Sequence, residues 1–120
     1  RHLATRVDFI YELTPADLPA LFRMARVFAY LPDACSEASI VPVVEALRAE
    51  LPMVLSDTRL NREAAGHAAA YVNPEVPGER LLRHALKICP AEQQALFRRR
   101  AELFSEYAVA ERLMQIYTSL

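Results

Sequence analysis

Two carboxylates flank a predicted helix start and could hold a polar ligand between them. Glu37 lies in a loop after the apolar run 27–31, and Glu45 lies about one turn into the helix that Pro42 is placed to open. Backbone N–H groups at a helix start favour an anion such as a diphosphate. Carboxylates accept hydrogen bonds from sugar or ribose hydroxyls, so the pair suits a ligand with a phosphate between two polyols. If only this pair is considered, the simpler interpretation is that Glu37 is a solvated loop residue and Glu45 an exposed helix residue.

The elements that would position these residues alternate between strands and helices. The expected strands are residues 7–11, 27–31, 51–55 and 69–72, and helices are expected at 14–26 and 41–49. Thr14 is the expected N-cap of the first helix, with Pro15 at its first position. Short apolar strands separated by helices predict an α/β fold, a parallel Rossmann-like half-sheet of about four strands with helices on both faces. Ligands of such sheets bind beyond the carboxyl ends of the strands.

The remainder of the chain is predicted to be helical. Helices are expected over residues 79–88, 90–104 and 107–120. We therefore divide a single partial domain of 120 residues into an α/β part, residues 1–89, and a C-terminal helical tail, residues 90–120.

Charge and composition exclude some classes of partner. The net charge of −1 and the pI near 6.3 give no global field that would favour nucleic acid or an anionic membrane. Two cysteines without a CxxC pair suggest free thiols in a reducing compartment, and no apolar run approaches the roughly 18 residues of a spanning helix. We expect a cytoplasmic protein, with the inner face of the membrane as a further location. The absence of an initiator Met fits a chain cut from something longer.

The segment 7–72 resembles the second half of the C-terminal domain of the group 1 retaining glycosyltransferases, which have the GT-B fold. Their signature is Glu-Gly-Phe-Gly-x-Pro-x-x-Glu. Glu37 and Glu45 stand at the family's spacing, with seven residues between them and Pro42 in register. Residues 56–57 and 63–74 resemble the segments that follow in the family. Residues 104–107 resemble its Phe-Ser-Trp segment, and the last helix resembles the tail that packs back towards the N-terminal domain.

The resemblance implies transfer of a sugar from a nucleotide diphosphate donor to a glycan or lipid-linked acceptor, with retention of configuration. It implies no cofactor and no bound metal, and a role in building a cell-surface polysaccharide or similar glycoconjugate. The acceptor domain, the first strands and the basic pair for the diphosphate would lie outside this chain, which alone would be inactive. By this resemblance Glu37 would lie beside the donor sugar as the catalytic carboxylate, and Glu45 would bind the ribose. The backbone amides of Ser39, Ile40 and Val41 would lie near the sugar and phosphates. Residues Tyr11 to Leu13 would border the base.

The sequence departs from the family's pattern at several glycines. Ala38 and Ile40 replace the two signature glycines, Glu50 replaces a third before the strand at 51–55, and Tyr11 stands where the family often has Gly. Glycine there permits close approach of the backbone and unusual φ, so Ile40 would narrow or reshape the donor pocket. A degenerate, non-catalytic binding or regulatory domain is therefore the alternative interpretation.

Other chemistry has weaker support. Asp57 after a strand suggests the phospho-acceptor of a receiver domain. Such a domain needs an acidic cluster after its first strand and a lysine after its last strand. Here the loop after the first expected strand has only Glu12, and the single lysine, Lys87, lies inside a predicted helix. The histidines and cysteines have no metal-ligand spacing. The arginines at 98–100 could meet an anionic lipid but fit a solvated helix face better. We also expect the chain to expose an apolar sheet edge and to self-associate through it.

Overall fold

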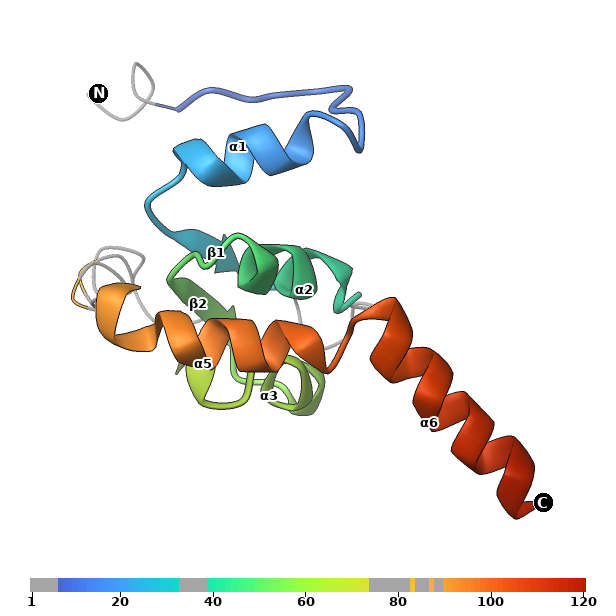
Figure 1. Cartoon of the computed structure of the whole chain (residues 1–120). Helices are drawn as coiled ribbons and strands as arrows, with labels where there is room; N and C mark the ends of the chain where they lie inside the picture. Colours follow the sequence, from blue (N-terminus) through green and yellow to red (C-terminus); the bar gives the residue numbers. More distant parts are fainter. Residues whose placement is uncertain (1–6, 33–38, 74–82, 84–86, 88–89) are drawn as a thin grey trace.

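The computed structural model describes residues 7–32, 39–73, 83, 87 and 90–120. In chain order the elements are α1 (Leu18–Met24), β1 (Phe28–Tyr30), α2 (Val41–Arg48), β2 (Met53–Ser56), α3 (Arg59–Ala65), the 3-10 turn η1 (Gly66–Ala68), β3 (Ala69–Val72), α5 (Pro90–Glu102) and α6 (Glu106–Ser119) (Figure 1). The helix expected at 79–88 lies mostly outside the described residues. The other two tail helices are confirmed.

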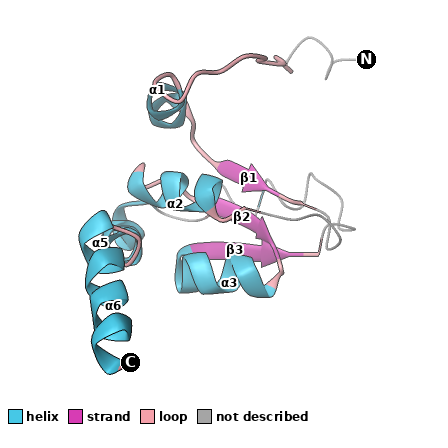
Figure 2. Ribbon diagram, turned by 90° about the vertical axis from the view of Figure 1, so that its right-hand side faces the viewer, coloured by secondary structure: helices cyan, strands magenta, loops and turns pink. Residues whose placement is uncertain are grey.

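The described strands form one parallel sheet in the order β1-β2-β3 (Figure 2). The register places Ala29 beside Val54 and Val54 beside Ala70. The α/β class and the parallel sheet are confirmed, although the described part contains three strands where the sequence suggested about four. The strands expected near residues 27–31, 51–55 and 69–72 are all present.

The expected first strand does not form. Residues 7–11 have no regular structure and are exposed, with Phe9 and Tyr11 76% and 80% exposed. Their rings stack on each other with centroids 6.5 Å apart. A β-rich run becomes a strand only where a neighbouring strand accepts its hydrogen bonds, and in the described sheet β1 pairs only with β2. The prediction of a strand at 7–11 was therefore wrong.

Helix α1 begins later than the sequence suggested. Residues 15–17 form a turn, the N-cap is Asp17, and the first helical residues are Leu18 and Pro19. The Asp17 carboxylate accepts hydrogen bonds from Thr14, from its backbone N at 3.3 Å and from its Oγ1 at 2.5 Å. Thr14 is thus a donor to Asp17 instead of the helix cap, and Pro19 takes the early helical position expected of Pro15.

The core lies on one face of the sheet. Met53 and Leu55 of β2 are fully buried and pack with Leu47 of α2 and Phe97 of α5. Helix α1 joins this face through Phe22, whose ring meets Phe28 edge-on at 5.5 Å. The opposite face carries Val54 and Ala70, with Val27 and Val72 packed against them. Helices α1, α2, α3 and α5 pack on the first face, so helices on both faces are not seen in the part of the chain that the structure describes.

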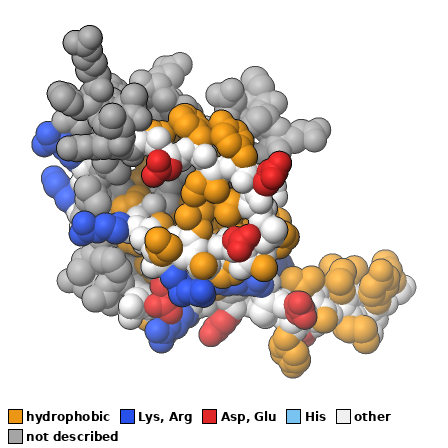
Figure 3. Space-filling model, turned by 90° about the horizontal axis from the view of Figure 1, so that it is seen from above, with side chains coloured by type: hydrophobic (Ala, Val, Ile, Leu, Met, Phe, Trp, Pro, Cys, Tyr) orange, Lys and Arg blue, Asp and Glu red, His pale blue; other side chains and the backbone are white. Residues whose placement is uncertain are grey.

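Helix α6 extends away from this body (Figure 1). Ser105 caps its start by accepting a hydrogen bond from the Ala108 N at 3.1 Å. None of its residues is buried, and hydrophobic side chains lie along it, as the space-filling view shows (Figure 3). Helices of this length are marginal in water without a packing partner.

Candidate functional site

The start of α2 comes shortly after the first predicted site residue in the sequence. That residue, Glu37, lies outside the described residues, and α2 begins at Val41 with Pro42 in its first turn, as the sequence predicted. The Ser39 hydroxyl accepts a hydrogen bond from the Val41 N at 3.2 Å. An anion bound by the Val41 amide would have to replace that hydroxyl.

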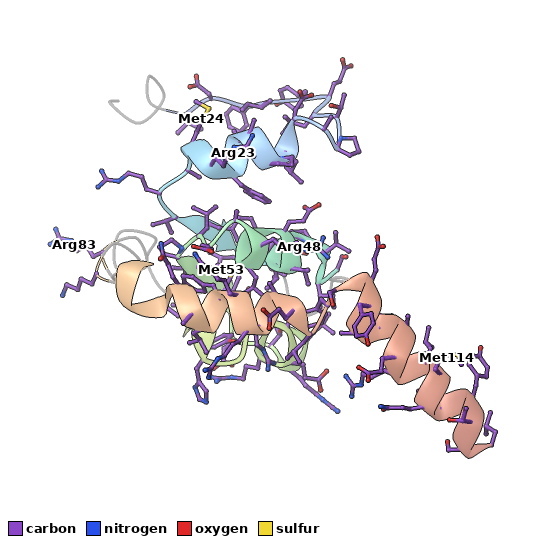
Figure 4. All side chains as sticks on the ribbon, in the orientation of Figure 1. Arg23, Met24, Arg48, Met53, Arg83 and Met114 are labelled. Carbon is purple, nitrogen blue, oxygen red and sulfur yellow. The ribbon has the colours of Figure 1, made fainter. Side chains whose placement is uncertain are left out.

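A cavity of about 420 Å³ separates α1 from α2 and contains the second predicted site residue, Glu45. The residues around it are Leu18, Pro19, Phe22, Arg23, Glu45, Arg48, Ala49 and Glu50. Figure 4 shows Arg23 on α1 and Arg48 on α2, the two helices that border the cavity. Leu18 and Pro19 belong to the first turn of α1, so the cavity reaches the end of α1 that follows residues 11–13.

The charges around the cavity differ in how they are engaged. Arg48 donates from Nη2 to the Phe104 carbonyl at 3.2 Å, and Glu50 pairs with Arg98 at 2.5 Å. The half-buried Glu45 carboxylate makes no hydrogen bond or ion pair with any residue that the structure describes. Its oxygens are therefore free to accept hydrogen bonds from a ligand.

The cavity combines three features that suit a nucleotide. Glu45 can accept from ribose hydroxyls, Arg23 and Arg48 supply positive charge, and Leu18 and Phe22 offer an apolar wall for a flat base. A second cavity of about 360 Å³ shares Phe22 and Arg23 with it, so the hollow continues along α1 towards the start of β1. The arrangement suits a bound polyol with an attached ring system.

The other predicted site residues that the structure describes do not line this cavity. Ser39 and Val41 are exposed, and Ile40 is half-buried against the core and borders a different cavity. Tyr11 is exposed beside Phe9. Among the described members of the predicted site, Glu45 alone therefore faces the cavity between α1 and α2.

Three features of the cavity were missed by reasoning from sequence. Arg48 follows Glu45 by three residues, so the spacing that places i and i+3 on one helix face could have pointed to it. Arg23 lies on α1, and nothing in the sequence indicated that α1 would face α2 at this point. The pairing of Glu50 with Arg98 joins residues 48 positions apart and had no local signal either.

Glu50 adopts a backbone conformation that favours glycine. Its φ is +55°, in the left-handed region that residues with a Cβ seldom adopt. This is the position at which the resembled family has Gly. The backbone here therefore has the turn that a glycine would form without strain.

Asp57, considered above as a receiver phospho-acceptor, is held in a surface ion pair at the carboxyl end of β2. Arg62 binds both of its carboxylate oxygens, at 2.5 and 2.8 Å, and this hydrogen bonding lowers the pKa of Asp57. The Arg62 guanidinium also lies 4.3 Å from the centre of the Tyr71 ring. Tyr71 in turn donates to the Gly66 carbonyl at 2.6 Å, so the group has a structural explanation.

The described part of the chain contains no group of three or more His, Cys, Asp or Glu that could hold a metal ion. It also contains no helix that is both long and apolar enough to cross a membrane.

Comparisons of the chain with models of protein families, with curated proteins and with solved structures found no match. Fold and cavity together define an α/β protein with a small parallel sheet and a helix-lined cavity, in which the Glu45 carboxylate has no partner among the described residues.

Proposed function

We propose that this chain is the donor-binding part of a retaining glycosyltransferase that uses a nucleotide diphosphate sugar. The observation that carries the proposal is the Glu45 carboxylate in the cavity between α1 and α2, which has no hydrogen-bond or ion-pair partner among the described residues. The parallel α/β order and the left-handed backbone at Glu50, where the resembled family has Gly, support it further. Residues from other parts of the enzyme would complete the site and bind the glycan or lipid-linked acceptor.

In this proposal the two carboxylates have different tasks. Glu45 accepts hydrogen bonds from the ribose hydroxyls, which holds the donor equally in the ground state and the transition state. Glu37 lies beside the donor sugar and stabilises the positive charge that develops there as the diphosphate leaves. Positive side chains and the α2 N-terminus stabilise the leaving diphosphate, so the reaction requires no bound metal.

Steady-state kinetics of the complete enzyme that contains this chain tests the assignment. Replacing Glu45 by Gln should raise KM for the donor about tenfold with a smaller change in kcat, because it removes uniform binding. Glu37→Gln should instead lower kcat about 100-fold or more while leaving the melting temperature unchanged. Glu111→Gln, on exposed α6, is the matched control and should change neither parameter. Loss of kcat alone in Glu45→Gln would contradict the ribose assignment.

One observation favours a second candidate, a non-catalytic domain derived from the same fold. Ile40 stands at a signature glycine of the resembled family and packs half-buried against the core at the start of α2. A β-branched side chain at this position reduces the space in which a donor sugar could approach the backbone. Ile40→Gly should then increase donor affinity if the domain is degenerate, which titration with a nucleotide sugar would measure.

A further inference from the structure

A different cavity lies where α2, α3, α5 and α6 meet. Its volume is about 400 Å³, within the range of small-molecule sites. The residues around it are Ile40, Leu60, Glu63, Ala64, Arg100, Leu103, Phe104 and Arg112. None of them lines the Glu45 cavity, so the two cavities share no lining residue.

The polar side chains of this cavity leave an excess of positive charge. The Arg100 Nε donates to the Ala64 carbonyl at 3.0 Å, and its Nη2 donates to the Glu63 carbonyl. Carbonyl oxygens orient the guanidinium without neutralising it. Arg112 makes no hydrogen bond or ion pair with a residue of the described ranges. The Glu63 carboxylate is already engaged, because Arg59 binds it at 2.9 Å.

The rest of the wall is apolar. Ile40, Leu60 and the adjacent Leu103 and Phe104 come from three different segments of the chain and surround the same space. A cavity with two arginines and an apolar wall fits a ligand that has an anionic group on a hydrocarbon body. Guanidinium groups bind phosphates and carboxylates through paired hydrogen bonds, whereas the hydrocarbon part gains from leaving water.

We propose that this cavity binds a small amphipathic anion, with Arg100 and Arg112 on its phosphate or carboxylate and the four apolar residues on its chain. The carbonyl contacts of Arg100 fix that guanidinium before the ligand arrives, which reduces the ordering cost of binding. The site is independent of the nucleotide-sugar proposal, apart from Ile40, whose backbone alone was assigned to the donor.

Calorimetric titration of the chain with octyl phosphate, octanoate, inorganic phosphate and 1-octanol tests the proposal. Octyl phosphate, octanoate or both should bind at least tenfold more tightly than either inorganic phosphate or 1-octanol, because each of the latter has only one of the two recognised groups. Which of the two anions binds better identifies the head group. Equal binding of 1-octanol and the anions, or no binding of the anions, would overturn the proposal.

Two variants locate the site. Arg112→Gln should weaken binding of the preferred anion about tenfold, because a hydrogen bond to a charged group is lost. The matched control is Arg99→Gln, an exposed α5 arginine that does not line the cavity, and it should leave affinity unchanged. Since Arg112 has no partner among the described residues, its replacement should leave the circular dichroism and melting temperature unaltered. The same loss in both variants would mean non-specific attraction to arginines and would refute the site.

Discussion

Replacing Gly66 by alanine tests how the tail helix α5 is attached to the sheet domain. Gly66 has φ +56° and ψ −124°, a conformation that residues with a side chain rarely adopt. A Cβ at this position would lie 3.1 Å from both Cζ and Nε of Arg100. The Arg100 guanidinium would therefore have to shift by a few tenths of an ångström, which disturbs its hydrogen bonds to the carbonyls of Glu63 and Ala64 at the end of α3.

The two effects set the size of the expected change. Backbone strain of this kind costs about 1–3 kcal/mol. The hydrogen bonds of a charged donor contribute about 1.5–3 kcal/mol, of which part is kept if Arg100 shifts only slightly. The alanine variant also has a less flexible unfolded chain, which offsets roughly 0.4–1 kcal/mol of this loss of stability. We expect Gly66→Ala to lower the free energy of unfolding by about 2–4 kcal/mol, or the melting temperature by roughly 10 °C.

Urea unfolding followed by circular dichroism measures this difference. The neighbouring His67→Ala is the control, because His67 is exposed and its change should stay within about 0.5 kcal/mol. In an Arg100→Ala background the steric part disappears, so Gly66→Ala should cost about 1–2 kcal/mol less there. A Gly66→Ala variant as stable as the original chain would show that this turn and the Arg100 contact do not hold α5 in place.

Three further predictions concern the turn before β2, the surface ion pair and the sheet edge. Because Glu50 has φ +55°, the Glu50→Gly variant should be about 1 kcal/mol more stable in urea unfolding than the Glu50→Ala variant. Both variants lose the ion pair with Arg98, but only the alanine variant keeps a Cβ. Equal stabilities of the two variants would contradict the backbone argument. The Arg62 hydrogen bonds lower the pKa of Asp57, so their stabilisation is present above about pH 4 and is lost as the pH falls through the lowered pKa. Asp57→Asn should therefore flatten the acid side of the melting-temperature profile, and an unchanged profile would count against the pair. Light scattering should show self-association through the edge of β1 that no described strand pairs with, and a monomer at high concentration would remove that expectation.

The sequence was informative where a local pattern determines the structure. Pro42 placed the start of α2, and the apolar runs placed the fully buried β2 and the partly buried β1 and β3, because parallel strands in a core need continuous hydrophobic residues. The same reasoning failed at residues 7–11. Composition indicates the capacity to form a strand, whereas pairing depends on a neighbour that the local sequence does not identify.

The candidate site was predictable only in part for a similar reason. Glu45 was found from its place about one turn into the helix that Pro42 opens and from its spacing to Glu37, but its cavity depends on how α1 lies against α2. The contact between Phe22 and Phe28 fixes that arrangement, and it joins two elements through tertiary packing. The pairs Arg98–Glu50 and Arg100–Ala64 likewise join residues far apart in the chain and carry no local signal.

Binding of nucleotide sugars to the cavity between α1 and α2 is the most direct test of the proposed function. Isothermal titration calorimetry should be performed with a panel of UDP, GDP and ADP sugars on the complete protein that contains this chain. We predict that at least one donor binds, that Glu45→Gln weakens its affinity about tenfold, and that Glu111→Gln does not change it. Absence of binding across the whole panel, or equal affinity in Glu45→Gln and the original protein, would contradict the account.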